Sequence, residues 1–209
     1  MLKALVGEVA VLQHELLRQL VRLTLRHQQQ LDRADELLEQ LEKLHDVAIV
    51  SEQLERASIS AQRGQLAILR LRYREAAQDF ADAAKHVPEE RGDIRLGYLD
   101  HEADAFYREG DERGDNAALT EAIERYRILL TLRSRDRVSL DWAMTQNNLG
   151  NALWSLGGRE SGTARLEQAV AAWKACLTVA ASGWPPAWVR EVRSHIEQAQ
   201  AENARRAAK

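Results

Sequence analysis

Apolar residues near the N-terminus recur at alternating steps of three and four, the spacing of one face of an α-helix. The first series consists of Leu2, Leu5, Val9, Leu12 and Leu16, and the second of Leu31, Ala34, Leu38, Leu41, His45 and Ala48. The polar stretch His27-Gln28-Gln29-Gln30 separates them, and they do not share one register. Residues 1–56 are therefore predicted to form a helical hairpin. The alternative is one long helix that pairs with a second copy as a coiled coil.

The middle of the chain repeats itself. Residues 98–130 match residues 145–177 at a shift of 47, with aromatic positions falling on aromatic or large apolar ones and small positions on small ones. The matched pairs include Ala105 with Ala152, Tyr107 with Trp154, Gly110 with Gly157, Leu119 with Leu166, Ala122 with Ala169 and Tyr126 with Trp173. Such a period indicates two similar helical units stacked side by side.

An earlier stretch follows the same scheme at a shorter spacing, with Gly64, Ala76, Phe80, Ala83 and Pro88. These intervals resemble those of the tetratricopeptide repeat family. The strongest match is the third unit, which contains Leu149-Gly150-x-x-Leu153 and Ala169-x-x-x-Trp173-x-x-Cys176. The stretch from Trp142 to Leu153, with its paired asparagines, is similar to the long-period bacterial type and to the repeats of kinesin light chains.

This resemblance implies an all-α fold, a right-handed α-solenoid of about three helix pairs. The units are expected at residues 57–90, 93–136 and 139–182. Two features depart from the family pattern: the later units carry extra residues between their helices, and the closing proline occurs only at Pro88. After the Trp-Pro-Pro-Ala-Trp stretch, residues 183–209 are expected to form a capping helix whose apolar side contains Trp188, Val189, Val192, Ile196 and Ala199.

Composition limits the classes of function. The net charge is −3, so the basic surface that nucleic acid requires is not expected. Cys176 is the single cysteine, which excludes an intramolecular disulfide and favours a reducing compartment. The N-terminal apolar run is interrupted by Glu8 and His14, and no stretch approaches the ~20 apolar residues of a membrane span. We expect a cytoplasmic protein with neither a signal peptide nor a membrane segment.

Motifs for chemistry are not found. The histidines form no His-Glu-x-x-His pair and Cys176 has no Cys-x-x-Cys partner, so neither a metal nor another cofactor is expected. Carboxylate pairs such as Glu89 and Glu90 are predicted to lie on a solvent-exposed helix surface. Cys176 sits at a small core position of its unit and is predicted to pack there. The chain is therefore expected not to be an enzyme.

The family resemblance implies that the first helix of each unit lines a concave groove that binds another protein or peptide. The groove-facing positions expected in the second and third units are Asp100, Asp104, Tyr107, Asn147, Asn151 and Trp154. Carboxylates favour a ligand with basic residues, and carboxamides can bond to its backbone. The alternative is that the asparagines bond to neighbouring turns and that Tyr107 and Trp154 pack between repeats.

The expected function is thus that of an adaptor or scaffold. Two alternatives stay open: a self-association module that forms a homodimer through its N-terminal helices, and the interaction portion of a larger signalling protein.

Overall fold

The computed structural model describes residues 2–23, 28–133, 135 and 139–208. Within these ranges the chain is helical and contains no strand. The helices are α1 (Leu2–Leu23), α2 (Gln28–Leu69), α3 (Tyr73–His86), the short 3-10 helix η1 (Glu89–Arg91), α4 (Gly92–Arg113), α5 (Asn116–Leu132), α6 (Ser139–Arg159), α7 (Ala164–Gly183) and α8 (Pro186–Ala207). The expectation of an all-α protein is confirmed.

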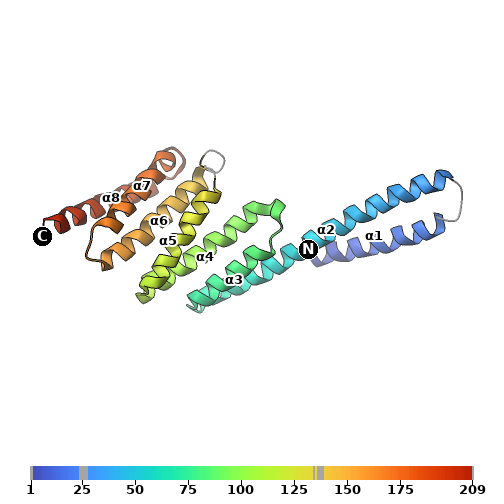
Figure 1. Cartoon of the computed structure of the whole chain (residues 1–209), viewed down its shortest axis with the longest axis horizontal. Coiled ribbons are helices and arrows are strands. Elements are labelled where there is room, and N and C mark those ends of the chain that lie inside the picture. The colour runs from blue at the N-terminus through green and yellow to red at the C-terminus, as the bar shows by residue number, and fades with distance from the viewer. Residues whose placement is uncertain (1, 24–27, 134, 136–138, 209) are drawn as a thin grey trace.

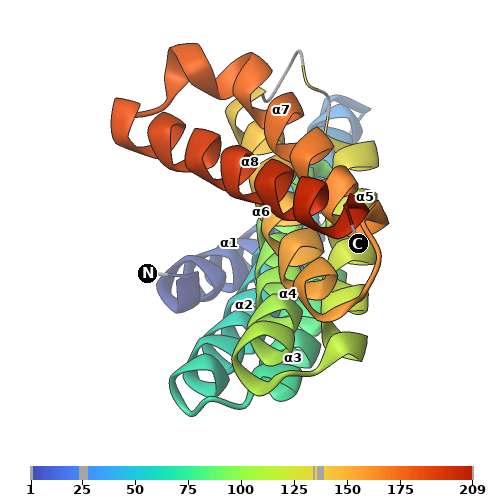
Figure 2. The ribbon, with the colours of Figure 1, turned by 90° about the vertical axis from the view of Figure 1, so that its left-hand side faces the viewer.

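The α-helices pack in chain order. Each contacts the next from α1 to α8, and α4 also contacts α6. The result is an elongated molecule with the α1–α2 hairpin at one end and α7 and α8 at the other (Figure 1). Figure 2 views it from the C-terminal end, where α7 and α8 lie nearest the viewer. None of the described helices combines the length and apolar character needed to cross a bilayer.

The longest helix, α2, joins the N-terminal hairpin to the rest of the molecule. It packs against both α1 and α3. Ala34 and Leu37 are buried near its beginning and Ala57 and Ala67 near its end. The domain boundary expected at residue 57 falls inside this helix, so the hairpin and the first predicted unit share one continuous element.

The turn between α4 and α5 is specified locally. Gly114 adopts a positive φ of 75°, which ends α4 in the left-handed region that glycine tolerates. The next residue, Asp115, caps α5: its Oδ1 accepts hydrogen bonds from the backbone N–H groups of Ala117 at 2.9 Å and Ala118 at 3.1 Å. Because only two residues connect these helices, the extra length of this unit lies in the helices themselves.

Packing inside the last two helix pairs repeats with the sequence. A Cβ on Gly110 would lie 2.5 Å from Cγ of Leu119, and a Cβ on Gly157 would lie 2.9 Å from Cδ2 of Leu166. Both leucines are fully buried. Only glycine therefore lets the end of α4 meet α5, and the end of α6 meet α7, this closely.

The largest buried cluster extends from α4 to α8. Its members include Leu119, Ile123, Tyr126, Leu153, Trp173 and Ile196. On α8, the side chains of Val189, Val192, Ile196 and Ala199 are buried as expected, but Trp188 is 49% exposed. Arg206, near the end of α8, donates to the carbonyl oxygens of Gly157 at 2.9 Å and Glu160 at 2.6 Å. It thereby satisfies carbonyl groups that the end of α6 leaves open.

The contact between Gly150 and Trp173 provides a test of this packing. A Cβ at Gly150 would lie 2.5 Å from Nε1 of Trp173, whereas a Cβ at Gly97, in the interior of α4, would meet nothing within 4 Å. We expect Gly150→Ala to lower the free energy of unfolding by about 1–3 kcal/mol, as overpacking does. Gly97→Ala should raise it by up to about 1 kcal/mol, because alanine favours helix. Urea unfolding followed by far-UV circular dichroism measures both, and stabilisation by both substitutions would contradict the packing described.

Candidate functional site

Helices α4, α6 and α8 line two neighbouring cavities, and we call their shared surface the α4–α6–α8 face. The first cavity, about 370 Å³, lies mainly between α4 and α6 and is lined by Asp104, Tyr107, Arg108, Glu112, Tyr126, Asn148 and Asn151. The second, about 210 Å³, lies between α6 and α8 and is lined by Met144, Asn147, Asn151, Trp184, Trp188, Glu191, Val192 and His195. Asn151 belongs to both, so the two cavities adjoin.

The structure brings four of the six sequence-predicted residues to the walls of these cavities: Asp104, Tyr107, Asn147 and Asn151. Asp100 and Trp154 line neither. Asp100 is paired with the buried Arg133, whose Nη1 donates to Oδ1 of Asp100 at 2.8 Å and to Oγ1 of Thr145 at 2.5 Å. The ring of Trp154 packs against that of Trp173, with centroids 6.3 Å apart. At these two positions the side chains join helices together.

A hydrogen bond between a large aromatic residue and a polar one occurs twice, 47 residues apart. The hydroxyl of Tyr126 on α5 donates to Oδ1 of Asp104 on α4 at 2.6 Å. The indole Nε1 of Trp173 on α7 donates to Oδ1 of Asn151 on α6 at 3.1 Å. In both pairs the second helix supplies a buried aromatic ring and the first helix supplies the acceptor. The internal repeat of the sequence is therefore also a repeat of contacts.

The bond from Trp173 fixes the orientation of the Asn151 amide. An indole N–H can only donate, so the amide oxygen faces it and the amide nitrogen is directed elsewhere. That nitrogen has two donor hydrogens, and no protein acceptor for them is found in the described part of the chain. Because Asn151 lines both cavities, the arrangement presents a hydrogen-bond donor at the junction between them.

Asp104 is partly buried at the wall of the first cavity. Burial raises the pKa of its carboxyl group, and the hydrogen bond from Tyr126 partly offsets this. The Asn148 Nδ2 also donates to the Asp104 carboxylate, at 3.3 Å. Burial and the nearby carboxylate in turn hold the pKa of Tyr126 well above its usual value. Asp104 therefore links α4, α5 and α6, and its negative charge is supported by neutral donors.

The cavity between α6 and α8 contains features that the sequence did not single out. Trp184 and Trp188 meet edge to face, with ring centroids 5.8 Å apart, and Trp188 is half exposed. The ring of His195 packs against that of Trp173 in a tilted arrangement, with centroids 5.3 Å apart, and its buried Nδ1 has no hydrogen-bond partner among the described residues. Glu191 is exposed at the rim. The Trp-Pro-Pro-Ala-Trp stretch was the available signal, but the expected helix phase assigned Trp188 to the buried side.

Two observations concern metal binding and thiol reactivity among the described residues. No three His, Cys, Asp or Glu side chains among them gather as a metal ion would require. Cys176 is buried, and burial raises the pKa of its thiol to about 11, so the nucleophilic thiolate is scarce at neutral pH.

Comparison with protein-family models, curated proteins and solved structures finds no match.

Replacing Asp104 with asparagine tests the buried charge. Because the folded-state pKa is raised, this group stabilises the fold when protonated, below its unfolded pKa, and that stability is lost as pH rises through the folded pKa. Asparagine still accepts the Tyr126 hydroxyl but carries no charge. We expect the stability of Asp104→Asn relative to wild type to increase as pH rises from about 4 to about 7.

Asp82→Asn is the control, because the hydrogen bond from Lys85 lowers the pKa of Asp82. That group stabilises the fold above its unfolded pKa and loses the contribution as pH falls, so the relative stability of this variant should change in the opposite direction. Urea unfolding over the same pH range measures both. A pH-independent difference for Asp104→Asn would contradict the account of its environment.

Proposed function

We propose that the chain is a non-enzymatic protein-interaction adaptor of the tetratricopeptide-repeat type, in which the helix pairs form a right-handed solenoid. Chain-order packing, the additional contact of α4 with α6 and the repeated aromatic–polar hydrogen bonds support this assignment. The ligand is an extended peptide segment of another protein, bound along the α4–α6–α8 face.

The observation that carries the proposal is the cavity between α6 and α8. Three partly exposed apolar side chains, Met144, Trp184 and Trp188, stand there beside the amide of Asn151 and the unpartnered Nδ1 of His195. Its volume of about 210 Å³ suits one large side chain rather than a whole small molecule. Exposed tryptophans that can be fully covered by a partner are the side chains that most often dominate binding energy.

The neighbouring polar groups favour a peptide with basic residues. The Asn151 amide can donate to a backbone carbonyl of the ligand. Around it, the lining carboxylates Asp104, Glu112 and Glu191 outnumber the one basic residue, Arg108. A lysine or arginine of the ligand is therefore attracted to this face, and added salt should weaken the attraction by screening.

Affinity capture tests this function. The whole chain serves as bait in an extract of the cells that make it, alongside Trp188→Ala and the matched control Leu132→Ala. Trp188 is 49% exposed and Leu132, on α5, is 52% exposed, so neither substitution should disturb folding greatly. We expect one or more proteins to be captured by wild type and by the control, and their affinity for Trp188→Ala to fall by about 30-fold or more, as at a binding hot spot.

A second variant examines the amide. Asn151→Asp keeps an oxygen that accepts the Trp173 indole N–H but removes the donor hydrogens, so the captured protein should bind it more weakly. Equal capture by wild type, Trp188→Ala and Asn151→Asp, with all three folded, would exclude the α4–α6–α8 face as the binding site.

One observation favours self-association as a second function. A cavity of about 510 Å³ lies between α1 and α2 and is lined by Gln13, Leu17, Leu38, Leu41, Glu42 and His45. Leu17 and Leu38 are 44% and 46% exposed. A second hairpin of the same kind, laid over this surface, would complete a four-helix bundle. The 22 residues of α1 span about 33 Å, so two adjacent helices offer roughly the 800 Å² per partner that a stable interface needs.

Sedimentation equilibrium tests the dimer. Removal of residues 1–56 would cut α2 in its interior, so point substitutions are the sharper tool. If the wild type is a dimer, Leu38→Glu should convert it to a monomer, whereas Ile128→Glu, at a similarly exposed site on α5, should leave it dimeric. A wild-type chain that stays monomeric at all concentrations would exclude this function.

A further inference from the structure

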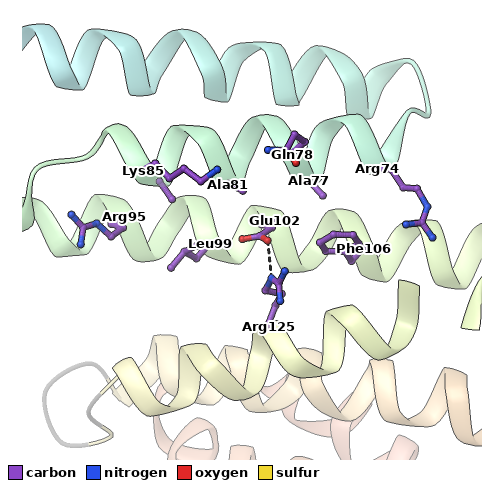
Figure 3. Close-up of a pocket in the computed structure, with 11 residues that line it drawn as sticks. Arg74, Ala77, Gln78, Ala81, Lys85, Arg95, Leu99, Glu102, Phe106 and Arg125 are labelled. Atoms are coloured by element: carbon purple, nitrogen blue, oxygen red, sulfur yellow. Dashed lines mark hydrogen bonds and ion pairs between the residues drawn. The ribbon is translucent and has the colours of Figure 1, made fainter. Parts of the chain in front are cut away.

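Another groove lies between α3, α4 and α5, on a side of α4 distinct from the α4–α6–α8 face. Its volume is about 680 Å³, and we call it the α3–α5 groove. It is lined by Arg74, Ala77, Gln78, Ala81, Ala84 and Lys85 of α3, by Arg95, Leu99, Glu102 and Phe106 of α4, and by Arg125 of α5 (Figure 3). Successive helix residues are about 100° apart, so Leu99 and Glu102 point roughly opposite to Asp104.

The lining of this groove is basic. It includes four cationic side chains and one carboxylate, that of Glu102. Glu102 is buried and accepts a hydrogen bond from Nε of Arg125 at 2.7 Å. Two of the other cations have partners at the rim: Lys85 contacts Asp82 at 2.9 Å, and Arg74 pairs with Asp115 and lies 3.7 Å from Glu109. Among the lining residues, cations outnumber carboxylates, the reverse of the α4–α6–α8 face, and rim carboxylates pair with two of these cations.

Arg95 is the exception among these cations. Its Nη2 donates to the carbonyl oxygen of Val87 at 2.7 Å, which holds the guanidinium in place. Its Nε is buried without a hydrogen-bond partner, and no ion pair of Arg95 is found among the described residues. A guanidinium held in this way can still donate to a carboxylate. Lys85 lies at the same end of the groove (Figure 3), and its solvent-exposed pair with Asp82 is weak and readily exchanged.

The floor of the groove is apolar. The small side chains Ala77 and Ala81 of α3 and the larger Leu99 and Phe106 of α4 line it (Figure 3). The Arg125 guanidinium lies over the Phe106 ring, 5.8 Å from its centroid. The 12 residues from Arg74 to Lys85 span about 16 Å of helix. That length matches about five residues of extended peptide and exceeds what a single anion would occupy.

We propose that the α3–α5 groove binds an acidic peptide segment of a partner protein. A carboxylate of the segment is bound by Arg95 and Lys85, and a leucine- or phenylalanine-sized side chain rests on Ala77, Ala81, Leu99 and Phe106. This site is separate from the one on the α4–α6–α8 face and selects ligands of the opposite charge. The protein would then hold two partners, or two segments of one partner, on different sides of α4.

A displayed library of random twelve-residue peptides, selected on the whole chain, tests the proposal. We expect enrichment of peptides that combine Asp or Glu with a large apolar residue. The selected peptides, made synthetically and labelled with a fluorophore, are then titrated against variants. Arg95→Glu and Lys85→Glu should each weaken binding by about ten-fold or more, through loss of a charge-assisted bond and gain of repulsion.

Two controls separate this site from others. Lys174→Glu makes the same change of charge at an exposed position on α7, and Trp188→Ala alters the α4–α6–α8 face; neither should change binding of the acidic peptides more than about two-fold. Lys85 is exposed, so its substitution reports on binding even if Arg95→Glu unfolds the chain. Failure to select acidic peptides, unchanged binding to Lys85→Glu, or displacement of the peptide by millimolar inorganic phosphate would each overturn the proposal.

Discussion

The rest of this molecule depends on the close approach of paired helices. Helices come this close where a glycine of one helix faces a large side chain of the other. Leu119 rests on Gly110, Leu166 on Gly157 and Trp173 on Gly150, and in each case a Cβ on the glycine would overlap the larger side chain. Helices this close can bury a leucine or a tryptophan completely, although each pair offers only a thin apolar layer. The next pair then covers what remains exposed, which is why the cluster continues from α4 to α8.

The same close approach determines the polar chemistry of the proposed binding face. A tryptophan or tyrosine buried at a helix–helix contact needs an acceptor for its polar hydrogen, because an unpaired buried donor costs about 1–3 kcal/mol. Asn151 and Asp104 supply these acceptors from the first helix of their pairs. Because the Asn151 amide oxygen accepts the Trp173 indole hydrogen, the amide nitrogen points away from it, and its donor hydrogens can bond to another molecule. Asn151 therefore both stabilises the helix pair and is oriented to bind a ligand.

Helix α4 has a central position in both proposed interactions. One of its sides contributes Asp104, Tyr107 and Glu112 to a face that is mainly acidic, and the opposite side contributes Arg95, Leu99 and Phe106 to a groove that is mainly basic. A net charge of −3 for the whole chain conceals this separation, because charges of opposite sign cancel in the sum. Charge steers and selects partners through its local arrangement, so the two surfaces discriminate between basic and acidic peptides.

The sequence by itself determined the helical class and the repeat at a shift of 47, because these depend on local propensity and on the spacing of apolar residues. It left open whether residues 1–56 form a hairpin or one long helix, and the structure shows α1 packed against α2. The sequence also placed Asp104, Tyr107, Asn147 and Asn151 on one side of their helices. Tertiary structure alone decided what these side chains do. Asp100 of α4 pairs with Arg133, which follows α5, and the spacing of residues along the sequence does not predict that ion pair.

The exposure of Trp188 and the assembly of the α3–α5 groove from three helices depend in the same way on how the helices cross. Trp188 fits the apolar phase of α8, yet in the first turn of this helix Val189 is buried, whereas Trp188 is 49% exposed and its ring meets that of Trp184. Arg95 and Arg125 are thirty residues apart in the sequence. They line the same groove only because α4 and α5 pack against each other. Periodicity specifies which residues share a face of a helix, and the packing angles between helices specify which faces are covered and which are left open.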